Sequence, residues 1–372
     1  MHILGLMSGT SLDGLDIAYC DIRDDGFTLL AAETIPYPTP WVERLSTLES
    51  SSAYQYCLAN VELGHYIGQQ VNRFREEHPG PVDAIASHGH TIFHQPGNRV
   101  ATEGSNLVPR VATEGSNLVP GLTTQIGDGD AIAAETGLPV IFNFRTMDVA
   151  LGGQGAPLVP IGDELLFGQY DACLNLGGIA NISFRARKEG KMVRQAFDIC
   201  PCNMALNHLA RLDGREYDRN GILARSGTLL ESLLDRMDSL DYYRQPLPKT
   251  LGKEWFTDNL LPLLQCQHKQ LPDMMRTTVE HIASQIAWAI RGRDIRSMLV
   301  TGGGAKNKFL IARLQAQIPS CHIYVPAEEI VDYKEAIIFA LLGYLRLKGR
   351  NNCLASVTGA SRDNCGGNIA GL

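Results

Sequence analysis

The sequence MSGTSLDG at residues 7–14 stands between two short apolar segments, residues 2–7 and 15–21, whose composition is typical of β-strands. Glycines let the backbone of such a turn approach an anion closely, and three hydroxyl side chains add hydrogen-bond donors. Asp13 is placed to hold a hydrated magnesium ion, because a hard cation prefers carboxylate and water oxygens. The stretch predicts a phosphate-binding hairpin, although strand–glycine–strand is also the pattern of an ordinary tight turn.

Two more glycine-rich turns follow apolar segments. LGGIAN at residues 176–181 again lies between two predicted strands, and TGGGA at residues 301–305 lies between a predicted strand (297–301) and a predicted helix (307–317). Two such hairpins followed by a strand–GGG–helix form the layout of duplicated ATP-binding folds, whereas the GxxxxGK[ST] and GxGxxG patterns are absent. The first two turns would bind phosphate from opposite domains, and the third would receive adenosine. The predicted phosphate ligands are Gly9, Thr10, Ser11, Asp13, Gly14, Gly177 and Gly178, and the predicted adenosine ligands are Gly302, Gly303 and Gly304.

The composition predicts a soluble globular protein of two domains. The chain has 372 residues, of which 44% are apolar and 20% are charged. A net charge of −7 without a basic run argues against binding to nucleic acid or an anionic membrane, and no apolar run reaches the roughly 20 residues of a membrane helix. The N-terminus lacks the features of a signal peptide, so we expect nine reduced cysteines and a cytoplasmic location.

Predicted strands and helices alternate along the chain, which favours an α/β architecture with mixed sheets. The other predicted strands are residues 27–34, 84–87, 139–144, 172–176 and 179–184, and the other predicted helices are residues 53–77, 277–291 and 335–347. We expect an N-terminal domain at residues 1–146, to which residues 350–372 return, and a C-terminal domain at residues 147–349.

The sequence RVATEGSNLVP occurs twice in succession, at residues 99–109 and 110–120. A solenoid needs several diverged copies, so this perfect duplication does not indicate a repeat fold. We interpret residues 99–120 as a surface loop, because long insertions into a loop cost little free energy. A specific lid is the functional alternative.

Eight motifs follow one another along nearly the whole chain. They are MSGTSLDG (7–14), SHGHTI (87–92), QIGDGDAIA (125–133), FRTMDVALGGQGAPLVP (144–160), LNLGGIANIS (174–183), FDICPCN (197–203), TGGGAKN (301–307) and VTGA (357–360). In this order they resemble the motifs of anhydro-N-acetylmuramic acid kinases. The run DVALGGQGAPLVP is long and specific, so chance does not explain the similarity.

The resemblance implies an enzyme that uses ATP, Mg²⁺ and water. It would open the ring of 1,6-anhydro-N-acetylmuramic acid and phosphorylate O6, which gives N-acetylmuramic acid 6-phosphate in the recycling of the bacterial cell wall. The fold implied is a pair of actin-like (RNase H-like) domains with mixed sheets flanked by helices and an ATP and sugar cleft between them. The resemblance also implies a homodimer.

The family places its catalytic base at the aspartate of a Phe-Asp-x-Gly-Pro-Gly-Asn motif, which falls on Asp198. A carboxylate there would take a proton from the water that attacks the anomeric carbon. The alternative is a helix cap before residues 203–209. The resemblance implies that the sugar ligands are His88, His90, Arg145 and Glu335, together with Thr10 or Ser11. Arg145 suits the lactyl carboxylate because guanidinium binds it bidentately, whereas helix capping competes with sugar binding at Glu335.

The sequence departs from the family pattern near Asp198 and at position 90. Cys200 and Cys202 stand where glycines are frequent, and cysteine at a positive φ would strain the turn. His90 replaces a frequent glutamine, and it can also donate or accept a hydrogen bond. Metal binding by the two cysteines, or by His88, His90 and His94, is a weaker interpretation, because further ligands nearby are lacking.

Two other functions stay open on the residues alone. The first is a kinase of an ordinary sugar hydroxyl, in which Asp198 deprotonates that hydroxyl directly. The second is a non-catalytic, actin-like nucleotide switch that moves a partner. Labelled water distinguishes the first function from ring opening, because only ring opening places oxygen from water at C1 of the product. ATP turnover without sugar would favour the second function.

Overall fold

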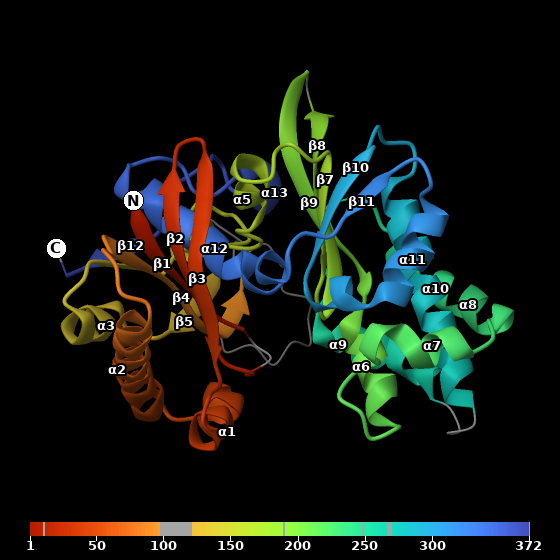
Figure 1. Cartoon of the computed structure of the whole chain (residues 1–372), viewed down its shortest axis with the longest axis horizontal. Helices are drawn as coiled ribbons and strands as arrows, with labels where there is room; N and C mark the ends of the chain where they lie inside the picture. Colours follow the sequence, from red (N-terminus) through yellow and green to blue (C-terminus); the bar gives the residue numbers. More distant parts are fainter. Residues whose placement is uncertain (10–11, 97–120, 189, 248, 266–269, 372) are drawn as a thin grey trace, which may run out of the picture. The chain divides into compact units, whose positions relative to one another are not determined.

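The computed structural model describes residues 1–9, 12–96, 121–188, 190–247, 249–265 and 270–371. It divides into two compact units, Met1–Leu166 with Glu335–Leu372 (unit 1) and Phe167–Lys334 (unit 2), whose elements are labelled in Figure 1. Thr10, Ser11 and the repeat at residues 99–120 lie outside the described residues, so what we expect of them remains a prediction. Within the described part of the chain, none of the helices has the length and apolar character to cross a membrane.

Unit 1 is built on a mixed sheet. Its strands are β1 (His2–Ser8), β2 (Leu15–Arg23), β3 (Gly26–Ile35), β4 (Ala84–Gln95), β5 (Leu122–Ile126), β6 (Val140–Phe142) and β12 (Asn368–Ala370). The order is β12-β6-β4-β1-β2-β3, with β5 paired to β4. Strand β1 is antiparallel to β2 and parallel to β4, and Ser8 faces Leu15 across the predicted hairpin.

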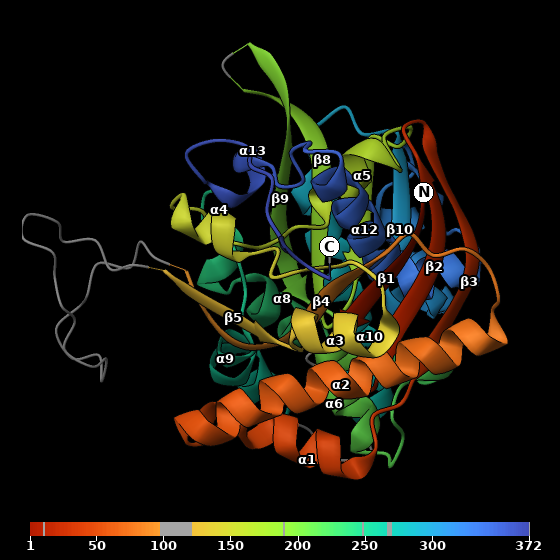
Figure 2. The same cartoon turned by 90° about the vertical axis from the view of Figure 1, so that its left-hand side faces the viewer.

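Helices pack on both faces of this sheet. They are α1 (Thr39–Thr47), α2 (Ala53–Glu77), α3 (Gly129–Thr136), α4 (Thr146–Ala150), α5 (Pro160–Leu165), α13 (Ala355–Thr358) and the part of α12 (Glu328–Leu347) from Glu335 onward. Leu63 and Ile67 of α2 join Leu4 of β1 in one core, and Figure 2 shows α2 along its length. Gly5 faces the other way, because strand side chains alternate, and a Cβ on it would lie 1.9 Å from Ala336 O of α12.

Unit 2 contains a second mixed sheet. Its strands are β7 (Ala172–Leu176), β8 (Ile179–Lys188), β9 (Lys191–Pro201), β10 (Ser297–Thr301) and β11 (His322–Tyr324). Its helices are α6 (Asn203–Arg211), α7 (Ile222–Ser226), α8 (Glu231–Asp238), α9 (Lys253–Trp255), α10 (Leu271–Ile290) and α11 (Lys308–Gln317). The apolar stripe of α10, including Val279, Ile282 and Ile286, packs with Leu174 and Ile182 of the sheet in one buried core.

The two sheets repeat one topology. Unit 1 contains the order β3-β2-β1-β4-β6, and unit 2 has the order β9-β8-β7-β10-β11. In each, three consecutive antiparallel strands are followed by two parallel ones, which need crossover helices to reach their places. The predicted α/β class of two actin-like (RNase H-like) domains is therefore confirmed.

The unit boundaries differ from those expected from the sequence. We expected divisions at 146/147 and 349/350, whereas the compact units divide at 166/167 and 334/335. The reason is packing: a Cβ on Gly162 of α5 would lie 2.4 Å from Ile338 Cγ1 of α12, so α5 and the part of α12 from Glu335 onward belong to unit 1. The expectation that Glu335 opens a helix is wrong, because α12 begins at Glu328.

Candidate active site

His88 and Arg145 form a tight pair in unit 1. The Nδ1 of His88 lies 2.8 Å from its acceptor, Gly89 O, and its Nε2 lies 2.8 Å from a terminal guanidinium nitrogen of Arg145. Burial, together with the charge of Arg145, lowers the pKa of His88 well below its usual value, so the ring is neutral. With Nδ1 protonated and Nε2 accepting, both ring nitrogens are used within the protein. The geometry therefore favours His88 as the residue that orients Arg145, rather than as a direct ligand of the sugar.

Arg145 keeps its charge in this buried setting. Burial lowers its pKa to about 10, and the charges of Glu335 and Cys353 act in the opposite direction. A second terminal nitrogen donates to Gly155 O at 2.7 Å, which ties the guanidinium to the loop after α4. An oriented guanidinium of this kind is suited to a carboxylate ligand.

A buried hydrogen-bond chain fixes the tautomer of His90. The Tyr37 hydroxyl donates to Ser8 Oγ at 2.9 Å, and Ser8 Oγ lies 3.0 Å from Nδ1 of His90. Burial lowers the pKa of His90 to about 4, so the ring is neutral, and with Ser8 Oγ accepting from Tyr37 and donating to Nδ1 we assign the remaining proton to Nε2. Within the described residues no acceptor reaches this Nε2–H, which leaves it able to donate to a ligand.

Asp148 organises the loops around Arg145. Its fully buried carboxylate accepts from the Gly155 amide at 2.8 Å, the Thr358 hydroxyl at 2.8 Å and the Asn364 side-chain amide at 2.9 Å. The Cys353 thiol, which is 3.1 Å away, donates as well, because burial and the Asp148 charge raise its pKa. The loop after α4 and the C-terminal segment at residues 353–364 are thus joined at one side chain, which has a structural role rather than contact with substrate.

Asp198 is half-buried on β9 of unit 2. Its Oδ2 accepts from the Leu251 amide at 2.9 Å, and its main-chain carbonyl accepts from the Tyr242 hydroxyl at 2.6 Å. Burial raises the pKa of Asp198 to about 6, against the opposing effect of the Leu251 hydrogen bond. No donor from the described residues reaches Oδ1, so this oxygen can accept a proton from a substrate. The helix-cap alternative is wrong, since Cys202 precedes α6 and Asp198 lies within the strand.

The second and third glycine turns meet at one edge of the unit 2 sheet. Strands β7 and β10 are parallel, with Asn175 opposite Thr301, so the turns that follow them lie side by side. Asn203 at the start of α6 donates to Leu176 O at 2.8 Å, and a Cβ on Gly304 would lie 3.1 Å from its Oδ1. The carboxyl ends of parallel strands are where open α/β sheets bind ligands.

Some of these glycines are required by packing, while others leave open space. Gly302 has a φ of +79°, and a Cβ on Gly304 would lie 2.7 Å from Leu176 Cβ, so the fold itself demands glycine at both positions. A Cβ on Gly178 would meet nothing closer than Met204 Cε at 3.9 Å, and one on Gly303 nothing closer than 3.5 Å. Neither has a positive φ. Neither packing nor backbone conformation explains why glycine stands at these two positions, whereas the close approach of a ligand would explain it.

Residues 7–9 and 12–14 of the first turn lie within the described part of the chain. Gly14 is required by packing, because a Cβ on it would lie 2.6 Å from Ile35 O, and Leu12 adopts a φ of +59°. Asp13 is exposed beside this turn, where its carboxylate could bind a hydrated Mg²⁺. The one cluster of possible metal ligands among the described residues is Glu33, Glu77 and His78, which includes none of the predicted site residues.

The family model for anhydro-N-acetylmuramic acid kinase matches residues 1–106 and 111–371. The chain belongs to this family. It is 35% identical to the anhydro-N-acetylmuramic acid kinase of Sulfurovum sp. over 372 residues, which cover 97% of this chain and 96% of that protein. It is also 35% identical to the enzyme of the same name from Vibrio cholerae over 382 residues, with 96% and 95% covered.

The chain is also similar to solved structures whose sequence identity to it is lower than that of these two kinases. The (R)-2-hydroxyglutaryl-CoA dehydratase component A of Acidaminococcus fermentans is 12% identical, with 92% of this chain and 96% of that chain covered and a TM-score of 0.45. A ROK family glucokinase from Streptomyces griseus is 12% identical, with 92% and 99% covered and a TM-score of 0.41.

The two cysteines that depart from the anhydro-N-acetylmuramic acid kinase pattern do not occupy positions of positive φ. Among the described residues other than glycine, a positive φ occurs at Leu12, Asn143 and Asn220, and thus at neither Cys200 nor Cys202. Both cysteines are fully buried in the unit 2 core, where burial raises their thiol pKa values. The condition under which cysteine would strain this turn, a positive φ, is therefore not met.

The predicted residues of this family member fall into two groups. Unit 1 holds His88, His90, Arg145, Glu335 and the first turn, and unit 2 holds Asp198, Gly177, Gly178 and Gly302–304. Sequence reasoning missed the partners Tyr37, Asn203, Tyr242 and Leu251. Tyr37 and Tyr242 act through hydroxyl groups on residues distant in sequence, and Leu251 through its backbone, so no local motif marked them.

Two glycine substitutions distinguish a glycine that leaves space for a ligand from one that the packing of the fold requires. Gly178→Ala should leave the thermal midpoint within about 2 °C of the parent but raise the KM for ATP about tenfold or more, because the methyl group enters the space next to the turn. Gly304→Ala should instead lower the midpoint, since its methyl group meets Leu176. Thermal unfolding and steady-state kinetics measure both. A Gly178→Ala enzyme with an unchanged KM for ATP would remove this turn from the ATP site.

Proposed function

We propose that this chain is an ATP-dependent kinase that opens 1,6-anhydro-N-acetylmuramic acid by hydrolysis and phosphorylates O6. The product is N-acetylmuramic acid 6-phosphate, and the role is recycling of the bacterial cell wall. The membership in the family supports the proposal. The observation that carries the chemistry is Asp198, a half-buried carboxyl with a pKa of about 6 and one oxygen open to a substrate. A base of that pKa is half-ionised at pH about 6 and mostly ionised at neutral pH, and it is a stronger base than an ordinary aspartate toward the proton of water.

In the proposed reaction, Asp198 accepts a proton from water as the water oxygen bonds to the anomeric carbon. The bond between C1 and O6 breaks, and O6 attacks the γ-phosphorus of ATP, which releases ADP. Arg145 binds the lactyl carboxylate of the sugar, held by His88 and Gly155. The Nε2–H of His90 donates to a sugar oxygen. Gly177 and Gly178 contribute to phosphate binding and Gly302–304 to adenosine binding.

Several finer assignments belong to the same proposal. Asp13 holds Mg²⁺ through water, and the ion when bound neutralises charge on the ATP phosphates. Gly9, Thr10, Ser11 and Gly14 complete the phosphate site, and Glu335 binds the sugar. The homodimer and the cytoplasmic location rest on the resemblance to the family.

The pH dependence follows from the raised pKa of Asp198. The ionised carboxylate is the active form of a general base, so protonation below pH about 6 removes it. We expect kcat/KM for the sugar to reach a plateau above pH about 7 and to fall about tenfold per pH unit below pH about 5.5. Steady-state kinetics across this range measure it, with ATP affinity recorded at each pH to account for ionisation of the γ-phosphate. A profile that stays flat down to pH about 5 would contradict the assignment.

The direct test of the function is ATP turnover with and without 1,6-anhydro-N-acetylmuramic acid, with the product identified by mass. The proposal predicts turnover that depends on the sugar and a product heavier than the substrate by one water and one phosphoryl group. Turnover that is independent of the sugar would favour the nucleotide switch. A product that gains the phosphoryl group alone would favour the ordinary hydroxyl kinase.

A further inference from the structure

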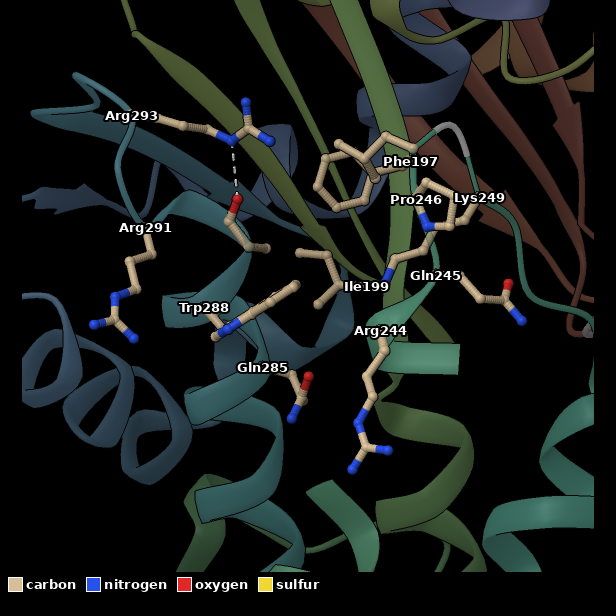
Figure 3. A pocket seen from close by; sticks show the side chains of 12 residues that line it. Phe197, Ile199, Arg244, Gln245, Pro246, Lys249, Gln285, Trp288, Arg291 and Arg293 are labelled. Atoms are coloured by element: carbon tan, nitrogen blue, oxygen red, sulfur yellow. Dashed lines mark hydrogen bonds between the residues drawn. The ribbon is translucent and has the colours of Figure 1, made fainter. Parts of the chain in front are cut away.

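A cavity of about 420 Å³ lies in unit 2, away from the glycine turns. Phe197 and Ile199 of β9 line it, whereas the intervening Asp198 is not one of the residues that line it. The far wall comes from α10, through Gln285 and Trp288 (Figure 3). The cavity is therefore separate from the candidate active site, and its size suits a small organic ligand.

The charges that line this cavity have one sign. Its twelve lining residues include Arg244, Lys249, Arg291 and Arg293, and none of the twelve is acidic. Arg244 and Arg291 are exposed, and neither guanidinium has a hydrogen-bond or ion-pair partner among the residues that the structure describes. Lys249 is only 8% exposed, and its ammonium donates to Tyr242 O at 3.1 Å instead of pairing with a carboxylate. On a chain with a net charge of −7, such a concentration of cations is suited to an anion.

An aromatic surface lies beside these cations. Trp288 is 55% exposed, which is high for an indole, and in Figure 3 it lies with Gln285 between Arg291 and Arg244. Arg293 is held at the rim, because its Nε donates to Ala289 O at 3.1 Å and its guanidinium packs over the Phe184 ring. An exposed indole face provides stacking area for a ring, and the two free guanidinium groups provide donors for phosphate oxygens.

The segment that forms one wall of the cavity also holds Asp198. Arg244 and Lys249 line the cavity, and in the same stretch the Tyr242 hydroxyl donates to the Asp198 carbonyl and the Leu251 amide donates to the Asp198 carboxylate. In addition, the Asp198 amide donates to Lys249 O at 3.2 Å. A ligand that shifts this segment would therefore shift the hydrogen bonds of Asp198.

We propose that this cavity is a second binding site for a small phosphorylated ring compound, either a nucleoside monophosphate or a sugar phosphate, and that its occupancy is coupled to Asp198. The ring packs on Trp288, and the phosphate binds one of the two guanidinium groups that flank the indole, that of Arg244 or that of Arg291. The binding part is independent of the proposed function, whereas the coupling part rests on it.

The binding test uses the full chain with fluorinated tryptophan, whose three resonances are assigned with Trp288→Phe. The probes are uridine 5′-monophosphate, glucose 6-phosphate and inorganic phosphate. We expect a saturable shift of the Trp288 resonance with at least one ring-bearing probe, and the probe that binds more tightly names the ligand class. The double variant R244Q/R291Q should weaken this binding about tenfold or more. The matched control Arg236→Gln, an exposed arginine on α8 of the same unit, should leave it unchanged.

Two results would overturn the binding site. One is the absence of a saturable Trp288 shift with all three probes at millimolar concentration. The other is binding of inorganic phosphate as tight as that of both ring-bearing probes, which would leave the indole without a role. For the coupling, the bound probe should change kcat about fivefold or more in the parent but not in the double variant. An unchanged kcat at a saturated site would refute the coupling alone, and since binding is read by resonance shift, this failure is distinct from failure of the proposed kinase function.

Discussion

Asp198→Asn is expected to lower kcat by about 10²–10⁴ while ATP binds as in the parent. The amide cannot take the proton of the attacking water, so ring opening loses its base. The local structure should persist, because the carbonyl oxygen of asparagine can accept the hydrogen bond that Leu251 N–H now donates to Oδ2. Release of ADP in the presence of the sugar measures kcat, and calorimetric titration measures the affinity for ATP.

The thermal stability of the Asp198→Asn variant provides a control, because the direction in which it should change can be predicted. Burial raises the pKa of Asp198 to about 6, so between pH about 4 and 6 the folded state binds more protons than the unfolded state. The contribution of Asp198 to stability therefore falls as pH rises through this range, and a neutral amide avoids that loss. The thermal midpoint of Asp198→Asn at pH about 8 should be no lower than that of the parent. Asp241→Asn, an exposed carboxylate nearby, should change neither property. A kcat close to the parent value would remove Asp198 as the base.

Asp148→Ala is expected to cost the largest loss of stability, about 3–4 kcal/mol in the free energy of unfolding. The carboxylate is fully buried and accepts hydrogen bonds from Gly155, Cys353, Thr358 and Asn364. Alanine would leave these buried donors without their acceptor, and each such donor carries a desolvation penalty. Urea unfolding without ligands measures the loss.

Two further variants make this prediction specific. Asp363→Ala removes an exposed carboxylate in the same C-terminal segment, which accepts one hydrogen bond from the Ala355 amide, and should cost about 1 kcal/mol or less. Thr358→Ala removes one of the donors to Asp148 and should give an intermediate loss that is measurable even if Asp148→Ala fails to fold. If Asp148→Ala were as stable as Asp363→Ala, the buried network would not be the element that joins these segments.

The elements that the sequence predicted well are those with a strong local pattern. Helix α2 has the predicted bounds, because an apolar stripe runs along it and Ser52 and Gln55 form a capping box at its start. Strand β9 was missed, since its buried Arg194 interrupts the apolar alternation, and its guanidinium donates to Ser183 of β8 and Cys173 of β7. The polar side chains of His88 and His90 likewise interrupt the apolar pattern of β4, so the predicted strand was shorter than the observed one.

The candidate active site was likewise predicted only in part from the sequence. The motifs identified Asp198, His88, His90 and Arg145, but they did not indicate how these residues act. The roles depend on hydrogen bonds between residues far apart in the chain, such as Ser8 to His90 and Arg145 to His88. These bonds fix the tautomers and the charges, and only the folded chain brings their partners together.

Ring opening coupled to phosphorylation is the central claim, and water labelled with a heavy oxygen isotope tests it most directly. The enzyme, ATP and 1,6-anhydro-N-acetylmuramic acid are incubated in this water, and the product is analysed at once by mass spectrometry with fragmentation. We predict one labelled oxygen, attached to C1, and an unlabelled phosphate ester at O6. A product without label at C1, or with label in the phosphoryl group, would contradict water attack at the anomeric carbon.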